Sequence, residues 1–500
     1  MRLRLEKAHL VVWGNDLNIR LSLKRNAALL AGAALVSLSG CGGHGAANVL
    51  GLTVPGSATQ SAASQFVIGQ VPESNPPMGG PPHQPPPHGQ GFFPDTTVGI
   101  HALQIFDQDH GNMITIGQGI ADGSRYASVW GVRTPSMAVA WHTNNVNLNA
   151  LIYTPFDTDA TGSGLNEPTS WWLANHPDWI LYECDRSTIA YVGGLSGVPL
   201  DISNPAVIKY QMSLLGGFAE ANGYNGVAAD IVSLDNNTGH VDSGHGGCGV
   251  WQANHTVWVQ KFSGAKSDPA WATAAIGWVT SAHAALHNPR TYSRPLALAI
   301  NTAVNGYVAP VNGVGGDPGE RAIIGNADIV LNESGFADWG GYVSDHGLVN
   351  AVGWMEYAQS LGEGTLVADD WNRQHQPPTI PQLDYSIATY LMGKEQAAAL
   401  YVGSNSMYGK ENYYPQYHAA VGTACAPMYG GPSDPPFTGE DVFFRKYSGA
   451  LAVVNVSAKK TYVVKLPKSS YTSIEGGQVK SPLSILPDTG YVLLTTNGCS

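Results

Sequence analysis

The stretch ADIVLNESGFADW, residues 327–339, places an acidic residue directly after an apolar run. Its first six residues predict a buried strand, because Ile329, Val330 and Leu331 follow one another without a polar interruption. Glu333 comes directly after this strand. A carboxylate resists full burial unless it is paired or hydrogen-bonded, so its place at the end of an apolar strand needs a structural explanation and a partner.

Seven other short apolar runs share this character and alternate with segments of helical periodicity. We expect strands at residues 99–106, 126–132, 148–156, 225–232, 296–301, 327–332, 364–369 and 397–404. We expect the clearest helices at residues 204–222, 268–287, 344–362 and 379–396. Continuous apolar strands that alternate with helices indicate a parallel sheet covered by helices. Eight such units predict an α/β protein with a (β/α)8 TIM barrel rather than an open, nucleotide-binding sheet.

The N-terminal segment, residues 1–40, predicts a secretory leader. Lys24 and Arg25 precede an apolar run that is too short to span a membrane. The residues Leu-Ser-Gly before Cys41 match a bacterial lipobox, which predicts cleavage before Cys41 and lipid on its sulfur. An ordinary signal peptide with a chance cysteine is the alternative. We therefore expect a protein of the bacterial cell envelope, held at the outer membrane or cell surface by the lipid alone, with its body outside the cytoplasm.

Three further segments follow this leader. Residues 41–94 are rich in Gly, Ser and Pro and predict a disordered linker. Residues 95–430 contain the eight predicted strands and form the barrel domain. From about Asp441, apolar and polar residues alternate between turn signals, so residues 431–500 predict a small antiparallel β-sandwich domain.

The charge of the chain excludes one class of partner. Charged residues make up only 12% of the sequence, and after removal of residues 1–40 there remain 19 Lys and Arg against 35 Asp and Glu, a net charge of −16. Nucleic-acid binding depends on Lys and Arg at phosphates, so we expect no nucleic-acid partner. Neutral or cationic partners fit such a surface better.

Four cysteines remain beyond Cys41. An even number of cysteines outside the cytoplasm indicates disulfides, and four cysteines allow three pairings. We favour the two pairings that are nearest in sequence, Cys184 with Cys248 and Cys425 with Cys499.

Two carboxylates fall where a barrel places its chemistry, at the carboxyl ends of the strands. Asp230 ends the fourth predicted strand, and Glu333 follows the sixth. Strands two apart in a ring of eight aim side chains into one basin, where a carboxylate pair suits glycosidic cleavage. The alternative is that Asp230 caps a loop and Glu333 pairs with an arginine such as Arg321.

Other side chains near the predicted rim are candidates for binding sugar. Aromatic rings stack on the apolar faces of sugars, and carboxylates bind hydroxyl groups, although tryptophan more often anchors a loop. These candidates are Tyr153, Trp172, Asp369, Asp370 and Trp371. The loop of residues 235–251 contains His240 and other polar residues but lacks the pattern of a calcium site, so we interpret it as a loop tethered by a cysteine, with metal binding as the alternative. No CxxC or HExxH motif occurs, and we expect no metal and no cofactor.

Five stretches of the sequence together suggest a family. They are HPDWILYECD (176–185), LDISNPAVIKYQ (200–211), GYNGVAADIVSLDN (223–236), DIVLNESGF (328–336) and FFRKYSGALAVVNVSAKKTYVVKLP (443–467). Over roughly residues 96–495 the chain resembles hypothetical glycosyl hydrolase family 15, which is similar in turn to endo-α-1,4-polygalactosaminidases.

The resemblance implies roles for both carboxylates, with Asp230 as nucleophile and Glu333 as general acid and base. The arrangement is also similar to retaining α-galactosidase-type barrels, which carry Asp in place of the glutamate. From the sequence we predict a glycoside hydrolase that cleaves a polysaccharide or oligosaccharide. A non-catalytic carbohydrate-binding lipoprotein on a barrel scaffold and a metal-dependent polysaccharide deacetylase are the alternatives.

Overall fold

The computed structural model describes residues 91–193, 195–302, 317–337, 341–371, 377–430 and 441–499. Within the predicted leader it also describes two short antiparallel strands, β1 (Val11–Trp13) and β2 (Asp16–Asn18). Cys41 and most of the predicted linker lie outside the described residues. Within the described part of the chain, every helix is too short or too polar to cross a lipid bilayer.

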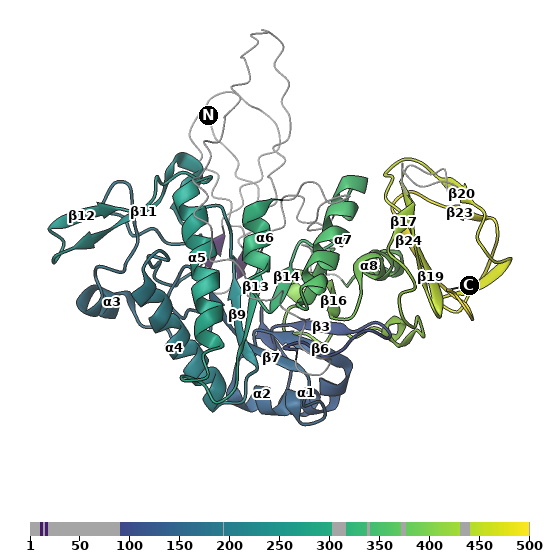
Figure 1. The fold of residues 1–500 in the computed structure, drawn as a ribbon, viewed down its shortest axis with the longest axis horizontal. Helices are drawn as coiled ribbons and strands as arrows, with labels where there is room; N and C mark the ends of the chain where they lie inside the picture. The colour runs from purple at the N-terminus through teal and green to yellow at the C-terminus, as the bar shows by residue number, and fades with distance from the viewer. Residues whose placement is uncertain are drawn as a thin grey trace, which may run out of the picture. The chain divides into compact units, whose positions relative to one another are not determined.

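Eight parallel strands close into a barrel, as the sequence predicts (Figure 1). In chain order around the ring they are β3 (Ala102–Ile105), β6 (Tyr126–Trp130), β7 (Asn149–Pro155), β9 (Gly226–Asp230), β13 (Ala297–Asn301), β14 (Ile329–Asn332), β15 (Gly364–Asp370) and β16 (Ala398–Gly403). Because β16 pairs with β3, the ring has no free edge.

Helices connect the strands. They are α1 (Ile116–Asp122), α2 (Pro135–His142), α4 (Pro205–Ala221), α5 (Pro269–Leu286), α6 (Pro318–Ile324), α7 (Asp345–Ser360) and α8 (Ile380–Gly393), with the 3-10 turn η1 (Gly123–Arg125) after α1. The four longest are the four expected from the sequence. Asn204 and Asp268 cap α4 and α5, each with a proline in the first turn. Two 3-10 turns, η3 (Asn405–Met407) and η4 (Pro415–His418), follow β16.

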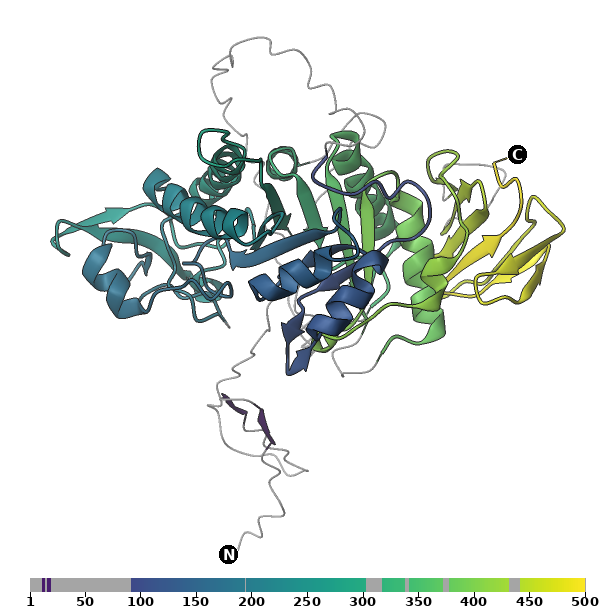
Figure 2. The same cartoon turned by 90° about the horizontal axis from the view of Figure 1, so that it is seen from below.

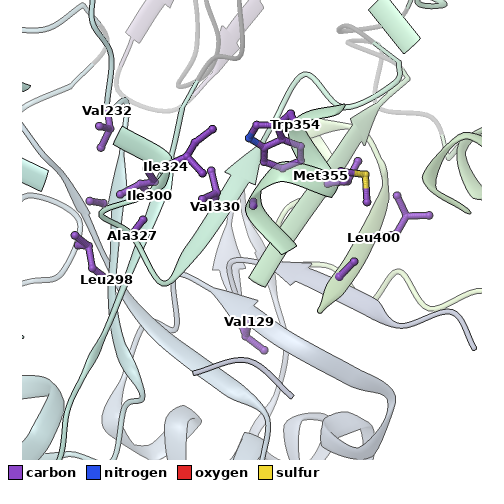
Figure 3. Packing of buried hydrophobic residues seen from close by; sticks show 14 of the residues in the cluster. Val129, Val232, Leu298, Ile300, Ile324, Ala327, Val330, Trp354, Met355 and Leu400 are labelled. Carbon is purple, nitrogen blue, oxygen red and sulfur yellow. The ribbon is translucent and has the colours of Figure 1, made fainter. Parts of the chain in front are cut away.

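Each strand divides its side chains between two apolar layers, because successive residues point to opposite faces. On β13, Ala297 and Ala299 face the interior of the barrel, whereas Leu298 and Ile300 face the helices. Figure 3 shows Leu298 and Ile300 gathered with Val330 of β14, Ile324 of α6 and Trp354 of α7. The small interior alanines leave room at the centre, and the outer layer holds the helices in place.

Two insertions form a separate small sheet beside the barrel. Its strands are β8 (Tyr182–Glu183), β10 (Gly239–His240), β11 (His245–Gln252) and β12 (Val257–Gln260). The same insertions contain the helix α3 (Thr169–Asn175) and the 3-10 turn η2 (Val241–Ser243). The strands β8 and β11 come from different insertions and pair antiparallel. The predicted disulfide Cys184–Cys248 is confirmed and joins the residue directly after β8 to β11. A hairpin of β4 (Gln108–Asp109) and β5 (Asn112–Met113) follows β3.

The C-terminal strands, yellow in Figure 2, form the predicted antiparallel β domain. One sheet has the order β17 (Tyr429–Gly430), β18 (Val442–Tyr447), β19 (Ala450–Asn455), β24 (Thr489–Leu494), β21 (Ser470–Ser473) and β22 (Gln478–Lys480). A second pair, β20 (Tyr462–Val464) and β23 (Leu483–Ile485), shares an apolar core with it, which makes a two-layered sandwich. The second predicted disulfide, Cys425–Cys499, is also confirmed.

A buried arginine fastens this domain to the barrel. Arg445 of β18 is fully buried, donates to the carbonyl oxygens of Met392 (2.6 Å) and Ala426 (3.0 Å), and pairs with Glu395. The carbonyl of Met392 belongs to the last turn of α8, where an arginine also complements the helix dipole. The barrel and the β domain are therefore joined by fixed hydrogen bonds as well as by the chain.

Candidate active site

Three polar side chains from adjacent strands meet at the carboxyl end of the barrel. Asp230 ends β9, Asn301 ends β13, and Glu333 follows β14. Each stands an even number of residues after an interior-facing residue of its own strand: Ala228, Ala299 and Leu331. The alternation of side chains therefore directs all three toward the barrel axis.

Asn301 joins the two carboxylates. Its Nδ2 donates to Asp230 Oδ1 at 2.7 Å and to Glu333 Oε2 at 2.8 Å. Because both distances are measured from the same nitrogen, the two oxygens are separated by at most the sum of those distances, 5.5 Å. The hydrogen-bond partner expected for Glu333 is therefore the side-chain amide of Asn301, which also binds Asp230.

The backbone around both carboxylates is specialised. Ile231 has φ 53°, a left-handed conformation that a β-branched residue rarely adopts, and its N–H donates to Asp230 Oδ1 at 2.9 Å. After Glu333 the chain turns at Gly335, with φ 51°, where a Cβ atom would lie 2.0 Å from Asp369 Oδ1. The residue at 335 must therefore be glycine for the loop to close against β15.

Two phenols complete the hydrogen bonding of the pair. Tyr153 on β7 donates to Asp230 Oδ2, and Tyr408, directly after η3, donates to Glu333 Oε1, both at 2.7 Å. Asp230 therefore accepts three hydrogen bonds and Glu333 accepts two from the described residues. The alternative pairing of Glu333 with Arg321 is not what holds this carboxylate, because its donors are Asn301 and Tyr408.

Burial raises the pKa of both acids, and their hydrogen bonds and mutual charge distinguish them. Glu333 is 8% exposed, and burial together with the charge of Asp230 raises its pKa to about 8. Burial also raises the pKa of Asp230, but the hydrogen bonds from Tyr153, Asn301 and the Ile231 amide oppose this rise because they favour the ionised form. The pair is thus arranged to hold one proton near neutral pH, on Glu333.

A cavity of about 310 Å³ opens in front of these groups. Seven of the eight strands supply its walls from their carboxyl ends or the loops that follow, as is usual for TIM-barrel sites. The aromatic part of the wall is Phe106, Trp130, Tyr153 and Tyr408, and the charged part away from the acid pair is Asp109, His110 and Arg133. Aromatic walls with a few convergent polar groups are typical of sites for sugars and other small ligands.

The remaining sugar-binding candidates occupy different positions. Asp370 shares the interior-facing alternation of Leu366 and Ala368, and its charge acts on Glu333, although its Oδ2 accepts from the Asn405 amide. Asp369 points the opposite way and accepts from the Phe336 amide at 2.6 Å, beneath the surface.

Two predicted tryptophan contacts are wrong, because both indoles are packed away from the cavity. Trp371 is 3% exposed and donates to Ser386 of α8. Trp172 is 1% exposed, donates to Asp159 Oδ2 at 3.0 Å, and packs in the apolar cluster of the insertion. Large apolar surface outweighs a possible ligand contact at both positions.

Sequence reasoning missed Asn301 and Tyr408. Asn301 ends a barrel strand, but it carries an amide, and the pattern that identifies Asp230 and Glu333 selects ionisable groups alone. Tyr408 lies in a loop beyond the last strand, and no periodicity directs attention to it. His240, in the loop considered for metal, contacts Glu183 at 2.7 Å, which ties that loop to β8.

Known proteins resemble this chain only weakly. No protein-family model and no curated protein matches the chain. Similar solved structures include a noncanonic maltogenic alpha-amylase from Thermotoga neapolitana, with 12% identity and a TM-score of 0.43, covering 79% of this chain and 98% of that one. An alpha-amylase from Malbranchea cinnamomea has 11% identity and a TM-score of 0.41, covering 80% and 97%. A GH36 alpha-galactosidase from Geobacillus stearothermophilus has 12% identity and a TM-score of 0.39, covering 79% and 55%. Similarities of this size carry no argument about activity, which rests on the site itself.

Proposed function

We propose that the chain is a retaining glycoside hydrolase. The observation that carries this proposal is the carboxylate pair bridged by Asn301, with oxygens at most 5.5 Å apart. Retaining enzymes keep their carboxyl groups about 5 to 5.5 Å apart, whereas inverting enzymes need about 6.5 to 9.5 Å to admit a water molecule between them and the sugar. The bridged separation favours the retaining geometry.

In the first step Glu333 acts as the acid. It protonates the departing glycosidic oxygen while Asp230 attacks the anomeric carbon, so that the glycosidic bond breaks and a glycosyl ester of Asp230 forms. Burial and the charge of Asp230 favour the protonated form of Glu333 near neutral pH, and the three donors around Asp230 favour its ionised form. The roles follow from these unequal environments.

In the second step Glu333 acts as the base. Now ionised, it takes a proton from water, whose oxygen attacks the anomeric carbon and releases Asp230. Tyr408 and Asn301 stabilise the charge that Glu333 carries during this step. The proton taken from water restores the acid form of Glu333, and the released sugar then leaves the site.

We propose a neutral or amino-sugar polysaccharide as the substrate. The resemblance to polygalactosaminidase-type enzymes and the net charge of −16 support this class, since an acidic surface repels polyanions. Screening purified protein against neutral, amino-sugar and uronic-acid polysaccharides tests it. Hydrolysis of the uronic-acid class alone would contradict the proposal.

Two substitutions test the roles of the acids. Asp230→Asn should abolish turnover of every substrate, whereas Glu333→Gln should still cleave aryl glycosides whose leaving group needs no proton. Asp369→Asn is the matched control, a buried aspartate at a neighbouring strand end that points away from the cavity. Azide should restore turnover of Asp230→Ala and give a glycosyl azide.

The binding-protein alternative makes a different prediction. It predicts saturable glycan binding with no hydrolysis, and no change when Asp230 or Glu333 is substituted. The deacetylase alternative requires metal ligands beside Asp230. Among the described residues, the group of three His, Cys, Asp or Glu side chains close enough to share an ion lies at the opposite end of β14.

We also propose export and lipid attachment at Cys41. Two disulfides support a location outside the cytoplasm, where such bonds persist. Metabolic labelling with a radioactive fatty acid should mark the wild-type protein and leave Cys41→Ala unlabelled. Equal labelling of both proteins would contradict attachment at this residue.

A further inference from the structure

Three metal-ligating side chains converge at the amino end of β14, away from the carboxylate pair. His287 Nε2 lies 3.0 Å from Asp328 Oδ2, and His283 Nε2 lies 3.4 Å from Asp328 Oδ1. The ligand atoms of all three residues lie within 4.8 Å of one another. Asp328 directly precedes β14, while Glu333 follows it, so about 16 Å of strand separates the two positions at ~3.3 Å per residue.

The positions of these side chains are set by rigid elements. His283 lies in the last turn of α5, and His287 is the residue at its C-terminal cap, one helical turn further on. Asp328 is held by the Leu298 amide, which donates to its Oδ2 at 2.8 Å. The histidine side chains are 31% and 25% exposed and the aspartate 8%, so an ion can reach them from solvent while the carboxylate stays fixed.

We propose that His283, His287 and Asp328 bind one Zn²⁺ ion. Two imidazole nitrogens and one carboxylate oxygen form a usual zinc ligand set, with water as the fourth ligand. Tetrahedral bonds of about 2.0 to 2.1 Å place ligand atoms roughly 3.3 Å apart. The two nitrogen to oxygen distances, 3.0 Å to Asp328 Oδ2 and 3.4 Å to Asp328 Oδ1, bracket that value.

Two further features favour a cation here. The carbonyl groups at the C-terminal end of α5 carry partial negative charge. Glu363, directly before β15, is buried, and its Oε2 accepts no hydrogen bond from the described residues. A divalent ion would offset both. Its role would be structural, because it would fasten the end of α5 to the start of β14 on the far side of the barrel from the cavity.

Zinc titration of the full-length protein, stripped of metal with a chelator, tests this proposal. We expect one Zn²⁺ per chain and a higher Tm on binding. His283→Gln and His287→Gln should each weaken binding by at least about 10-fold, the loss that even an outer-shell partner costs. The control His245→Gln removes an exposed histidine of the insertion and should bind as the wild type does.

Either of two results would overturn the site: no saturable binding by the wild type, or unchanged affinity in both glutamine variants. If the variants do not fold, Co²⁺ in the wild type decides, because a tetrahedral site gives intense visible absorption and loosely held Co²⁺ does not. Chelation should leave glycoside hydrolysis unchanged at temperatures where the protein stays folded. Failure of the metal site is therefore distinguishable from failure of the proposed enzyme activity.

Discussion

Tyr408 donates its phenolic hydrogen to Glu333 Oε1 at 2.7 Å, although 75 positions separate the two residues in the chain. Tyr153 makes the equivalent bond, also at 2.7 Å, to Asp230. Each carboxylate of the pair therefore has one phenol of its own and shares Asn301 with the other. This division allows the two acids to be perturbed one at a time.

Tyr408→Phe should move the alkaline limb of the pH–rate profile. The phenol favours ionised Glu333 and lowers its pKa, so its removal raises that pKa above about 8. Under the proposed mechanism the acid form then survives to higher pH, and the alkaline limb of kcat/KM should move upward by about one pH unit. An unmoved alkaline limb would show that Glu333 is not the acid.

Tyr153→Phe should move the acidic limb instead. Loss of the hydrogen bond to Asp230 Oδ2 raises the pKa of the nucleophile, so Asp230 ionises only at a higher pH. The acidic limb of the kcat/KM profile should move to higher pH, and the alkaline limb should move less. The same variant series thus measures both limbs, and movement of the alkaline limb alone in Tyr153→Phe would reverse the assigned roles.

Asn301→Ala should lower kcat by about 100-fold, as does removal of other charge-stabilising donors. The variant leaves each carboxylate without one of its donors at the point where they face one another. Asn455→Ala is the control, since Asn455 is a buried amide that donates to carbonyls of the β domain. The control should lower Tm and keep kcat, and equal loss of kcat in both would assign Asn301 a merely structural role.

Asp369→Asn should change stability with pH and leave KM unchanged. Burial raises the pKa of Asp369 to about 7, above its usual value of 3.8. The protonated native form is therefore favoured, and this contribution is fully present below about pH 4 and is lost as the pH rises through about 7. Thermal unfolding from pH 4 to 8 should show a shallower decline of Tm in the variant. A large rise in KM would instead return Asp369 to the sugar-binding surface.

Much of the fold follows from the sequence because the signals are long and repeated. All eight barrel strands were predicted within a few residues, since continuous runs such as the one ending at Leu331 suit a strand buried on both faces. Both disulfides follow from proximity along the chain. The roles of Trp172 and Trp371 could not be predicted, because burial of an indole depends on elements that approach it from elsewhere in the chain.

The carboxylates show where pattern reasoning stops short. Strand-end position identifies Asp230 and Glu333, and alternation along β15 separates Asp370 from Asp369 once the register is known. The hydrogen-bond donors are harder to predict, since Tyr408 reaches Glu333 only through the conformation of the loop after β16. The distance between the acids likewise depends on how the ring closes, which no local pattern encodes.

The left-handed backbone of Ile231 links local strain to the position of Asp230. Glycine at 231 would adopt this conformation without strain and, by that term alone, would stabilise the fold. It would also free the segment that donates to Asp230 and loosen the nucleophile. Ile231→Gly would therefore relieve the local backbone strain and, at the same time, weaken the positioning of the proposed nucleophile.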